Sequence, residues 1–174
     1  MKRYVPLSIL MALLFLLTAC SGSQTASTSE QLNDGKPAPE FTLVDLTGET
    51  HQLSQYAGEK VYIKFWASWC SICLSGMNEL NTLAGEDPDF KVLTIVSPGS
   101  NAEKNSDAFA KWFDGVDHTS NIRVLLDEGG PAFNDYGIIG YPTSVFIGTD
   151  GVLVKSQTGH MSNEQIYETF DNIQ

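Results

Sequence analysis

The sequence predicts a single α/β domain in which helices cover both faces of a mixed central sheet. Short apolar runs, each long enough for a buried strand, alternate with segments whose apolar residues recur at the helical spacing. Cys70 and Cys73, separated by two residues, stand where the first long apolar run passes into a helical segment. With 174 residues and 42% hydrophobic content, the chain is long enough for one domain with a core.

The first half of the domain is expected to contain a hairpin, a central strand and a helix. Residues 41–53 predict two short strands joined at Thr47 and Gly48. Residues 61–66 are almost wholly apolar, which is typical of a strand covered on both faces. A helix that begins at the cysteines follows, and its buried face would consist of four apolar residues at a spacing of three, Leu74, Met77, Leu80 and Leu83.

The second half is expected to alternate strands and helices before a final hairpin and helix. Residues 92–96 and 122–126 predict buried strands. Between them, Ser100 and Glu103 have the spacing of a capping box ahead of a helix with four apolar residues, Ala108, Phe109, Trp112 and Phe113. Residues 143–147 and 152–155 flank a hairpin turn. Ser162 and Gln165 are expected to cap the last helix.

The first 19 residues predict a secretory signal peptide. Lys2 and Arg3 precede an apolar run at residues 7–17, and small residues precede Cys20. The run is shorter than the roughly 20 apolar residues that a spanning helix needs. Its end is similar to the lipobox of bacterial lipoproteins, which implies cleavage before Cys20 and attachment of a diacylglycerol to its thiol. An uncleaved N-terminal anchor with an incidental cysteine is the alternative.

Both alternatives place a domain of residues 34–174 at the extracytoplasmic face of the cell membrane. Residues 20–33 would form the lipidated cysteine and a flexible tether, because residues 21–29 are too small and polar to build a core. All 21 acidic residues lie beyond Cys20, so removal of Lys2 and Arg3 with the leader changes the net charge from -11 to -13. This acidity disfavours nucleic acid as a partner.

The segment 69–73, with the sequence WCSIC, predicts a redox-active disulfide between Cys70 and Cys73. The first cysteine would lie where the unpaired N–H groups and the dipole of a helix favour an anion, so its thiolate is stabilised. We assign attack to Cys70 and resolution of the mixed disulfide to Cys73. A zinc site would need two further ligands, and no second Cys-x-x-Cys pair is present. A purely structural disulfide would remove little chain entropy from so small a loop.

Several segments resemble thioredoxin-like proteins of the TlpA/ResA type, within the wider redoxin-like superfamily, over residues 35–173. Residues 35–43 resemble the first segment of that family, and residues 65–73, with the sequence FWASWCSIC, are the most specific match. Residues 136–143 resemble its segment with a cis-proline beside the active site. The resemblance implies a thioredoxin fold, a central mixed β-sheet flanked by helices, with an N-terminal β-hairpin extension and a βα insertion.

The resemblance also implies which residues surround the disulfide. Pro142 is expected to be cis, which leaves the backbone of Tyr141 free to pair with an extended client peptide. An ordinary trans turn proline is the alternative at Pro142. Trp69, Ser71 and Ile72 are expected to support the active site and to contact the client. No cofactor and no metal is expected beyond the disulfide itself, and the protein is expected to be a monomer.

The match departs from the family pattern behind the disulfide. Lys64 stands where thioredoxins place a buried acid, six residues before the first cysteine. Gly76 stands where many relatives have a glutamate, and Glu79 is only a weak substitute. A lysine near the thiols would favour the thiolate and lower the pKa of the pair. A strand lysine whose ammonium simply reaches solvent is the alternative.

The resemblance implies a reductant that takes electrons from a membrane thiol-disulfide transporter of the DsbD/CcdA type. The exported client would be a methionine sulfoxide reductase, which we favour, or an apocytochrome c. An oxidase that forms disulfides in secreted proteins is the runner-up, because exported Cys-x-x-Cys proteins serve both directions. A metal-delivery binding module is an alternative of another class, although such modules use a longer Cys-x-x-x-Cys spacing. A peroxidase is disfavoured, because the Pro-x-x-x-Thr-x-x-Cys pattern is absent from the sequence.

Overall fold

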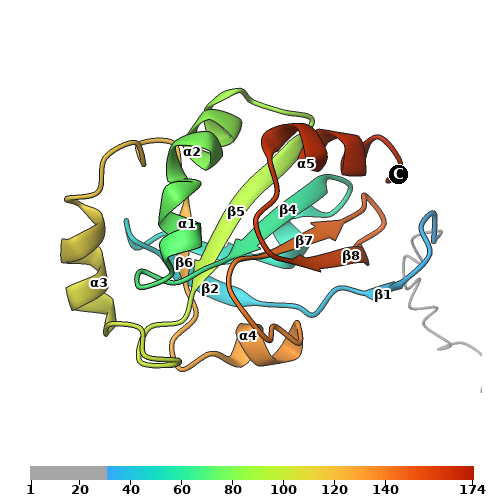
Figure 1. Cartoon of the computed structure of the whole chain (residues 1–174). Helices are drawn as coiled ribbons and strands as arrows, with labels where there is room; N and C mark the ends of the chain where they lie inside the picture. Colours follow the sequence, from blue (N-terminus) through green and yellow to red (C-terminus); the bar gives the residue numbers. More distant parts are fainter. Residues whose placement is uncertain (1–30) are drawn as a thin grey trace, which may run out of the picture.

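The computed structural model describes residues 31–174 (Figure 1). The predicted signal peptide, Cys20 and the tether up to residue 30 lie outside this part. Within residues 31–174 the helices are α1 (Ser71–Ser75), α2 (Met77–Gly85), α3 (Ser106–Phe113), α4 (Pro131–Asp135), α5 (Asn163–Phe170) and the 3-10 helix η1 (Leu53–Tyr56). The strands are β1 (Lys36–Pro37), β2 (Thr42–Asp45), β3 (Thr50–Gln52), β4 (Lys60–Phe65), β5 (Phe90–Val96), β6 (Val124–Leu126), β7 (Thr143–Ile147) and β8 (Val152–Thr158).

All of these strands belong to one mixed sheet, in the order β1-β8-β7-β4-β5-β6-β2-β3. The central strand β4 pairs in parallel with β5 and antiparallel with β7. The N-terminal hairpin β2–β3 joins the sheet through antiparallel pairing of β2 with β6. The sheet therefore confirms the predicted mixed α/β architecture with its hairpin extension, and β6 with α4 forms a strand–helix unit between α3 and β7.

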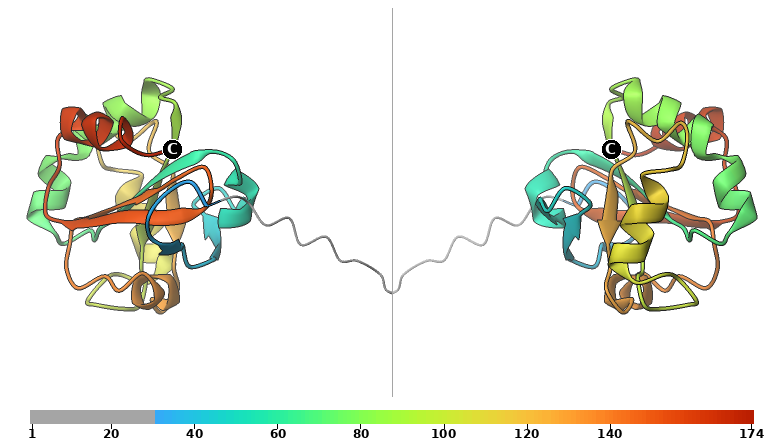
Figure 2. Two further views of the ribbon diagram at one scale, coloured as in Figure 1. Left: turned by 90° about the vertical axis from the view of Figure 1, so that its right-hand side faces the viewer. Right: turned by 90° about the vertical axis from the view of Figure 1, so that its left-hand side faces the viewer.

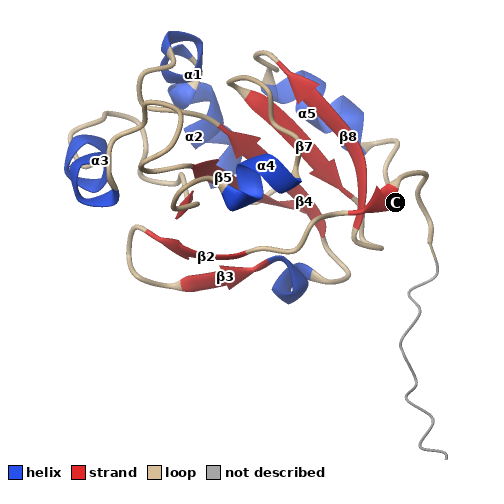
Figure 3. Cartoon of the chain, turned by 90° about the horizontal axis from the view of Figure 1, so that it is seen from below, coloured by secondary structure: helices blue, strands red, loops and turns tan. Residues whose placement is uncertain are grey.

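Helices cover both faces of this sheet. In Figure 1, α1, α2 and α5 lie above the sheet and α4 lies below it, and the two turned views in Figure 2 show the same layers. Viewed from below in Figure 3, α4 lies over the middle of the sheet and the hairpin β2–β3 lies at its edge. Among residues 31–174, we find no helix with the length and apolar character needed to cross a bilayer.

The alternation of side chains along β4 builds two separate cores. Tyr62 and Trp66 belong to the core beneath α1, α2, α3 and α5, whereas Ile63 and Phe65 belong to the core beneath α4 and η1. All four side chains are almost completely buried. A strand covered on both faces must be apolar throughout, which explains the uninterrupted apolar run in the sequence. The buried lysine within this run, Lys64, is the exception.

The helix predicted after the cysteines is interrupted. Helix α1 ends at Ser75 and α2 begins at Met77, with Gly76 between them. A Cβ atom on Gly76 would lie 3.0 Å from the ring of His160, so the imidazole fills the space beside this residue. The predicted buried face holds for Met77, Leu80 and Leu83, whereas Leu74 is only half-buried.

The predicted capping box at Ser100 and Glu103 is wrong. Helix α3 begins at Ser106, and its N-cap is Asn105, whose side chain accepts a hydrogen bond from Ala108 N–H at 2.9 Å. Glu103 is buried and its carboxylate is used in a contact with Ser68, far away in the sequence. Ser100 and Glu103 have the spacing of a capping box, but the Glu103 carboxylate bonds to Ser68 instead of to the start of a helix.

Several smaller features were not predicted from the sequence. These are β1, the helix α4 and the 3-10 helix η1, which begins at Leu53, the last residue of the expected extended stretch. Leu32 and Asn33 donate backbone hydrogen bonds of 2.7 and 2.8 Å to the carboxylate of Asp150. The ordered domain therefore starts at least two residues before residue 34, the expected boundary of the tether.

Candidate active site

The disulfide between Cys70 and Cys73 lies at the end of the loop that connects β4 to α1. The two Cα atoms are 5.2 Å apart, because one turn of α1 brings the side chains together. Cys70 is the N-cap of this helix, and its sulfur accepts a hydrogen bond from the N–H of Cys73 at 3.2 Å. A thiolate at Cys70 would find this donor already in place.

Both cysteine residues are buried, and the small difference in their exposure has the direction that the assigned roles require. Cys70 is 7% exposed and Cys73 is 2% exposed. Both belong to the core beneath α2 and α5. The more accessible Cys70 is therefore suited to exchange with a partner disulfide, and Cys73 is suited to the intramolecular step that follows.

Trp69 and Tyr141 form an aromatic rim beside the disulfide. Their ring centroids are 5.7 Å apart in an edge-to-face arrangement. Trp69 is 53% exposed, and its indole N–H donates to the carbonyl of Asn101 at 3.0 Å. The peptide bond between Tyr141 and Pro142 is cis, as the resemblance implied. These contacts bring the loops before α1, before α3 and before β7 together at one site.

The remaining predicted residues around the cysteines lie at the surface of α1. Ser71 and Ile72 are its first two residues, and both are exposed. The apolar side chain of Ile72 is 54% exposed, and Ile139, shortly before the cis-proline, is 91% exposed. Exposed apolar side chains on α1 and in the loop before the cis-proline favour contact with another protein.

A buried carboxylate that the sequence analysis did not identify as part of the site holds the loop before Cys70. Glu103 accepts a hydrogen bond from Ser68 Oγ at 2.6 Å and another from Ser68 N–H at 2.5 Å. Lys104 Nζ donates to the same Ser68 hydroxyl at 2.6 Å and lies over the ring of Trp112. Glu103 is therefore a positioning residue for the cysteine loop. In the sequence, Glu103 stood out only through its spacing from Ser100, and that spacing predicted a helix cap.

Lys64 lies on β4, on the same face as Tyr62 and Trp66 and thus toward the core that contains both cysteines. It is 3% exposed. Burial lowers the pKa of its ammonium, and the Glu79 carboxylate opposes this shift in part. The snorkelling alternative requires an ammonium in solvent, which this degree of burial does not favour.

Comparison with known proteins places this geometry in a family. The model of the redoxin family matches residues 33–172, which include the sheet, both cysteines and the cis-proline. The chain belongs to the redoxin family. A thiol-disulfide oxidoreductase ResA of Bacillus cereus is 30% identical to this redoxin over 147 residues, 84% of the chain and 82% of the relative. An uncharacterised protein of Haemophilus influenzae is 45% identical over 125 residues, 71% of the chain and 80% of that protein.

A solved structure gives the same result for the fold. The crystal structure of the pneumococcal exposed lipoprotein thioredoxin (Etrx1) from Streptococcus pneumoniae superimposes with a TM-score of 0.74 at 42% identity. The match covers 78% of this redoxin and all of the pneumococcal chain, 100%. The protein is thus a thioredoxin-fold thiol-disulfide oxidoreductase of the ResA/TlpA type, with Cys70 and Cys73 as its disulfide.

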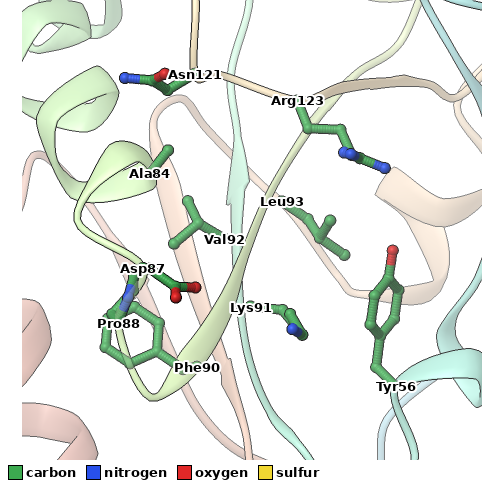
Figure 4. A pocket seen from close by; sticks show the side chains of 10 residues that line it. All are labelled: Tyr56, Ala84, Asp87, Pro88, Phe90, Lys91, Val92, Leu93, Asn121 and Arg123. Carbon is green, nitrogen blue, oxygen red and sulfur yellow. The ribbon is translucent and has the colours of Figure 1, made fainter.

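Two further groups of polar side chains lie outside the active site. A hollow of about 350 Å³ lies at the start of β5 (Figure 4). This is the end of the sheet opposite the disulfide, because β5 runs parallel to β4 and the cysteines follow the carboxyl end of β4. Both of its cations have carboxylate partners, Lys91 with Glu59 at 3.0 Å and Arg123 with Glu49 at 3.5 Å. We therefore assign no anionic ligand to this hollow.

A group of possible metal ligands lies next to this hollow. The ligand atoms of Asp45, Glu49 and His51 lie within 4.8 Å of one another. The guanidinium of Arg123 is 3.2 Å from His51 Nε2 and 3.5 Å from Glu49, so a cation already contacts these ligand atoms. We assign no metal to this group.

Proposed function

We propose that this redoxin is a lipid-anchored, extracytoplasmic reductant of exported proteins. The observation that carries this proposal is the disulfide at the start of α1, with Cys70, the more exposed of the two cysteines, beside an exposed aromatic and apolar rim. The similar pneumococcal protein is named an exposed lipoprotein thioredoxin, which supports attachment of this chain through Cys20. A domain held at the membrane surface can meet both membrane proteins and exported clients.

Electrons would come from a membrane thiol-disulfide transporter of the DsbD/CcdA type. A transporter thiolate attacks the Cys70–Cys73 disulfide, a mixed disulfide forms, and a second transporter thiolate releases the reduced pair. Cys70 then attacks the client disulfide, and Cys73 resolves the second mixed disulfide. Methionine sulfoxide reductase is the favoured client, since its catalytic cysteines need reduction after each cycle. Apocytochrome c is the second candidate.

The oxidase alternative uses the same atoms in the opposite direction. A midpoint potential of about -270 mV would favour reduction of clients, whereas one of about -120 mV would favour their oxidation. The metal-delivery alternative predicts stoichiometric retention of Cu(I) by the reduced Cys70–Cys73 pair. Measurement of the potential and of copper retention separates the three activities.

A trapping experiment tests the assigned roles and identifies the client. In a full-length Cys73→Ser variant, Cys70 can form the first mixed disulfide but cannot be released by Cys73. We expect the variant to accumulate a covalent complex with an exported protein. Mass spectrometry identifies that protein, and dithiothreitol releases it by reducing the mixed disulfide.

The matched variant Cys70→Ser provides the control. It retains the buried Cys73 and is expected to trap at least about tenfold less protein, because a buried thiol is a poor nucleophile toward a large partner. Trapping by Cys70→Ser but not by Cys73→Ser would show that the assigned roles are reversed. A trapped client that lacks a reducible disulfide would contradict the reductant proposal.

A further inference from the structure

Residues 100–103 form a tight turn in the loop between β5 and α3. The turn is closed by a hydrogen bond of 2.8 Å from Glu103 N–H to the carbonyl of Ser100. Its two central residues, Asn101 and Ala102, have φ angles of 48° and 61°. Positive φ at both central residues is the pattern of a type I′ turn. The shape of this turn therefore depends on two residues in the left-handed region.

Neither of the central residues is a glycine, which is the residue that adopts this conformation without strain. Asparagine tolerates the left-handed region better than most residues, because its short polar side chain can bond locally. Ala102 has no such compensation. Both side chains are exposed, so packing in the core does not require this backbone. Strain of this kind persists where neighbouring structure determines it, and it is concentrated at functional sites.

Two hydrogen-bonded contacts join the turn to the residues that precede the reactive sulfur. The carbonyl of Asn101 accepts a hydrogen bond from the indole N–H of Trp69 at 3.0 Å. The carboxylate of Glu103 accepts one from Ser68 Oγ at 2.6 Å. Ser68 and Trp69 are consecutive and lead directly into Cys70. Glu103 thus holds the backbone of the cysteine loop, and Asn101 holds the side chain that projects from it.

The contact with Asn101 fixes an indole that would otherwise be free to turn. Trp69 is 53% exposed, and its other aromatic neighbour is Tyr141, in an edge-to-face arrangement. A side chain that is free in solution loses conformational entropy when a partner packs on it. An indole that is already held by a hydrogen bond loses less. The Asn101 carbonyl therefore prepares this surface for a partner.

The surface around the indole indicates the chemistry of the segment that it receives. Trp69, Ile72 and Ile139 are the exposed large apolar side chains near the cysteines. The net charge of the chain is -11, which disfavours an acidic partner. A client segment with an aromatic or aliphatic side chain next to its reactive cysteine fits this surface.

We propose that Asn101 is a specificity-determining positioning residue, whose carbonyl holds Trp69 so that the indole receives an apolar side chain beside the cysteine of the client. The inference rests on the proposed function, because it requires a protein as client, but not on the direction of electron flow. Asn101 touches no reacting atom and acts through Trp69. Its effect is therefore on recognition of the client and not on the reactivity of Cys70.

An activated cysteine peptide measures this recognition without knowledge of the client. The probe is a short uncharged peptide with phenylalanine next to a cysteine that is linked to 2-nitro-5-thiobenzoate. The Cys70 thiolate attacks the peptide sulfur, a mixed disulfide forms, and the coloured thiobenzoate leaves. Cys73 then attacks Cys70, the Cys70–Cys73 bond forms, and the peptide leaves with the proton of Cys73. Two electrons pass from the cysteine pair to the probe.

The reference compound is N-acetylcysteine amide linked to the same leaving group. We expect the native protein to react at least about fivefold faster with the peptide, because a buried aromatic side chain adds contact area. Asn101→Val should lower this ratio about fivefold, since a β-branched residue opposes positive φ and displaces the carbonyl. Asn101→Gly should keep the ratio within about twofold, since glycine retains both the conformation and the carbonyl. The rate with the reference compound should stay the same in both variants.

A direct structural measurement accompanies the kinetics. The indole N–H of Trp69 gives a separate signal in the NMR spectrum of protein with labelled tryptophan. In Asn101→Val this proton should exchange with water at least about fivefold faster, because its acceptor is displaced. The exchange in Asn101→Gly should match that of the native protein.

Two further variants distinguish this role from a general effect on the fold. Asp87, with a φ of 50°, has the same left-handed conformation in the loop between α2 and β5, so Asp87→Val is the matched control and should keep the native ratio. Trp69→Phe should lower the ratio as much as Asn101→Val does. The two substitutions combined should lower it no further, because Asn101 acts through the indole.

The proposal is overturned if Asn101→Val keeps the ratio of Asp87→Val, or if the effects of Asn101→Val and Trp69→Phe add. A ratio near one in the native protein also overturns it. Should Asn101→Val not fold, a native ratio in Trp69→Phe would overturn it. Failure of the native protein to react with the reference compound as well as with the peptide would instead contradict the proposed thiol-disulfide function.

Discussion

At the scale of single residues, Asp45 shows how a buried carboxylate can be stabilised by many donors. One oxygen accepts hydrogen bonds from Thr47 N–H at 2.8 Å, Thr47 Oγ1 at 2.7 Å and Glu49 N–H at 3.0 Å. The other is 3.1 Å from His51 Nε2. Burial by itself would raise the pKa of Asp45, but these hydrogen bonds outweigh it and lower the pKa to about 2.

The consequence is a stability that depends on pH. We expect Asp45→Asn to reduce the free energy of unfolding by about 2 kcal/mol at pH 7, because hydrogen bonds to a charged acceptor are lost. The folded pKa lies below the unfolded one, so this contribution is complete above the ordinary aspartate pKa of 3.8 and fades as pH falls toward about 2. Urea unfolding of both proteins from pH 7 to pH 2.5 measures the difference. If the difference in the free energy of unfolding between the two proteins does not narrow below pH 4, the proposed role of the Asp45 carboxylate is wrong. Asp135→Asn, a substitution at an exposed residue, is the control.

At the scale of elements, α5 has the cap that the sequence predicts. The Ser162 hydroxyl accepts a hydrogen bond from Gln165 N–H at 3.3 Å, and the Gln165 side chain accepts one from Ser162 N–H at 3.0 Å. We expect Ser162→Ala to lower the free energy of unfolding by about 1 kcal/mol, with the thiol reactions unchanged. Thermal unfolding measures this effect. The exposed Ser156→Ala on β8 should have almost no effect, and an equal loss in both variants would argue against the cap.

The two helices that follow the cysteines show a different kind of element. Their apolar residues have the period of one continuous helix, yet Gly76 separates α1 from α2. His160, which comes from the segment before α5, occupies the space beside this glycine. Helical periodicity reports which side of a segment faces the core, and a local break at a single residue leaves that periodicity almost unchanged.

At the scale of the whole molecule, Asp150 joins the two ends of the described chain. Its carboxylate accepts hydrogen bonds from the N–H groups of Leu32 and Asn33, and from the Asn33 amide at 2.9 Å. The same amide donates to the carbonyl of Gln174 at 3.0 Å. The turn between β7 and β8 thus holds the segment that enters the domain and the residue that ends it. Burial would raise the pKa of Asp150, and these hydrogen bonds lower it instead.

Loss of this connection should loosen the start of the domain without touching the active site. We expect Asp150→Ala to lower the free energy of unfolding by about 2 kcal/mol, because several hydrogen bonds to a charged group are lost together. Amide hydrogen exchange at residues 32–36 should become about tenfold faster, since local opening needs less free energy. The reaction of Cys70 with thiol reagents should not change. Asp34→Ala, an exposed neighbour, is the control, and equal exchange rates in the two variants would contradict this role.

Patterns between nearby residues were sufficient to predict the fold class and the position of the cysteine pair. The apolar run of β4, the Cys-x-x-Cys spacing and the cap at Ser162 depend on neighbours within one turn or one strand, so the linear sequence contains them. The resemblance to TlpA/ResA proteins added the thioredoxin fold and a cis Pro142, and both agree with the structure.

The surroundings of the disulfide were decided only by the tertiary structure. Glu103 has the spacing of a capping residue, but its contact is Ser68, 35 positions earlier in the chain. Lys64 lies between Thr94 and Ser144, which strands from distant parts of the chain bring to either side of it. The sequence determined where the reactive sulfurs lie. Which charged groups support them depended on packing between distant segments, because a side chain takes the partner that folding places next to it.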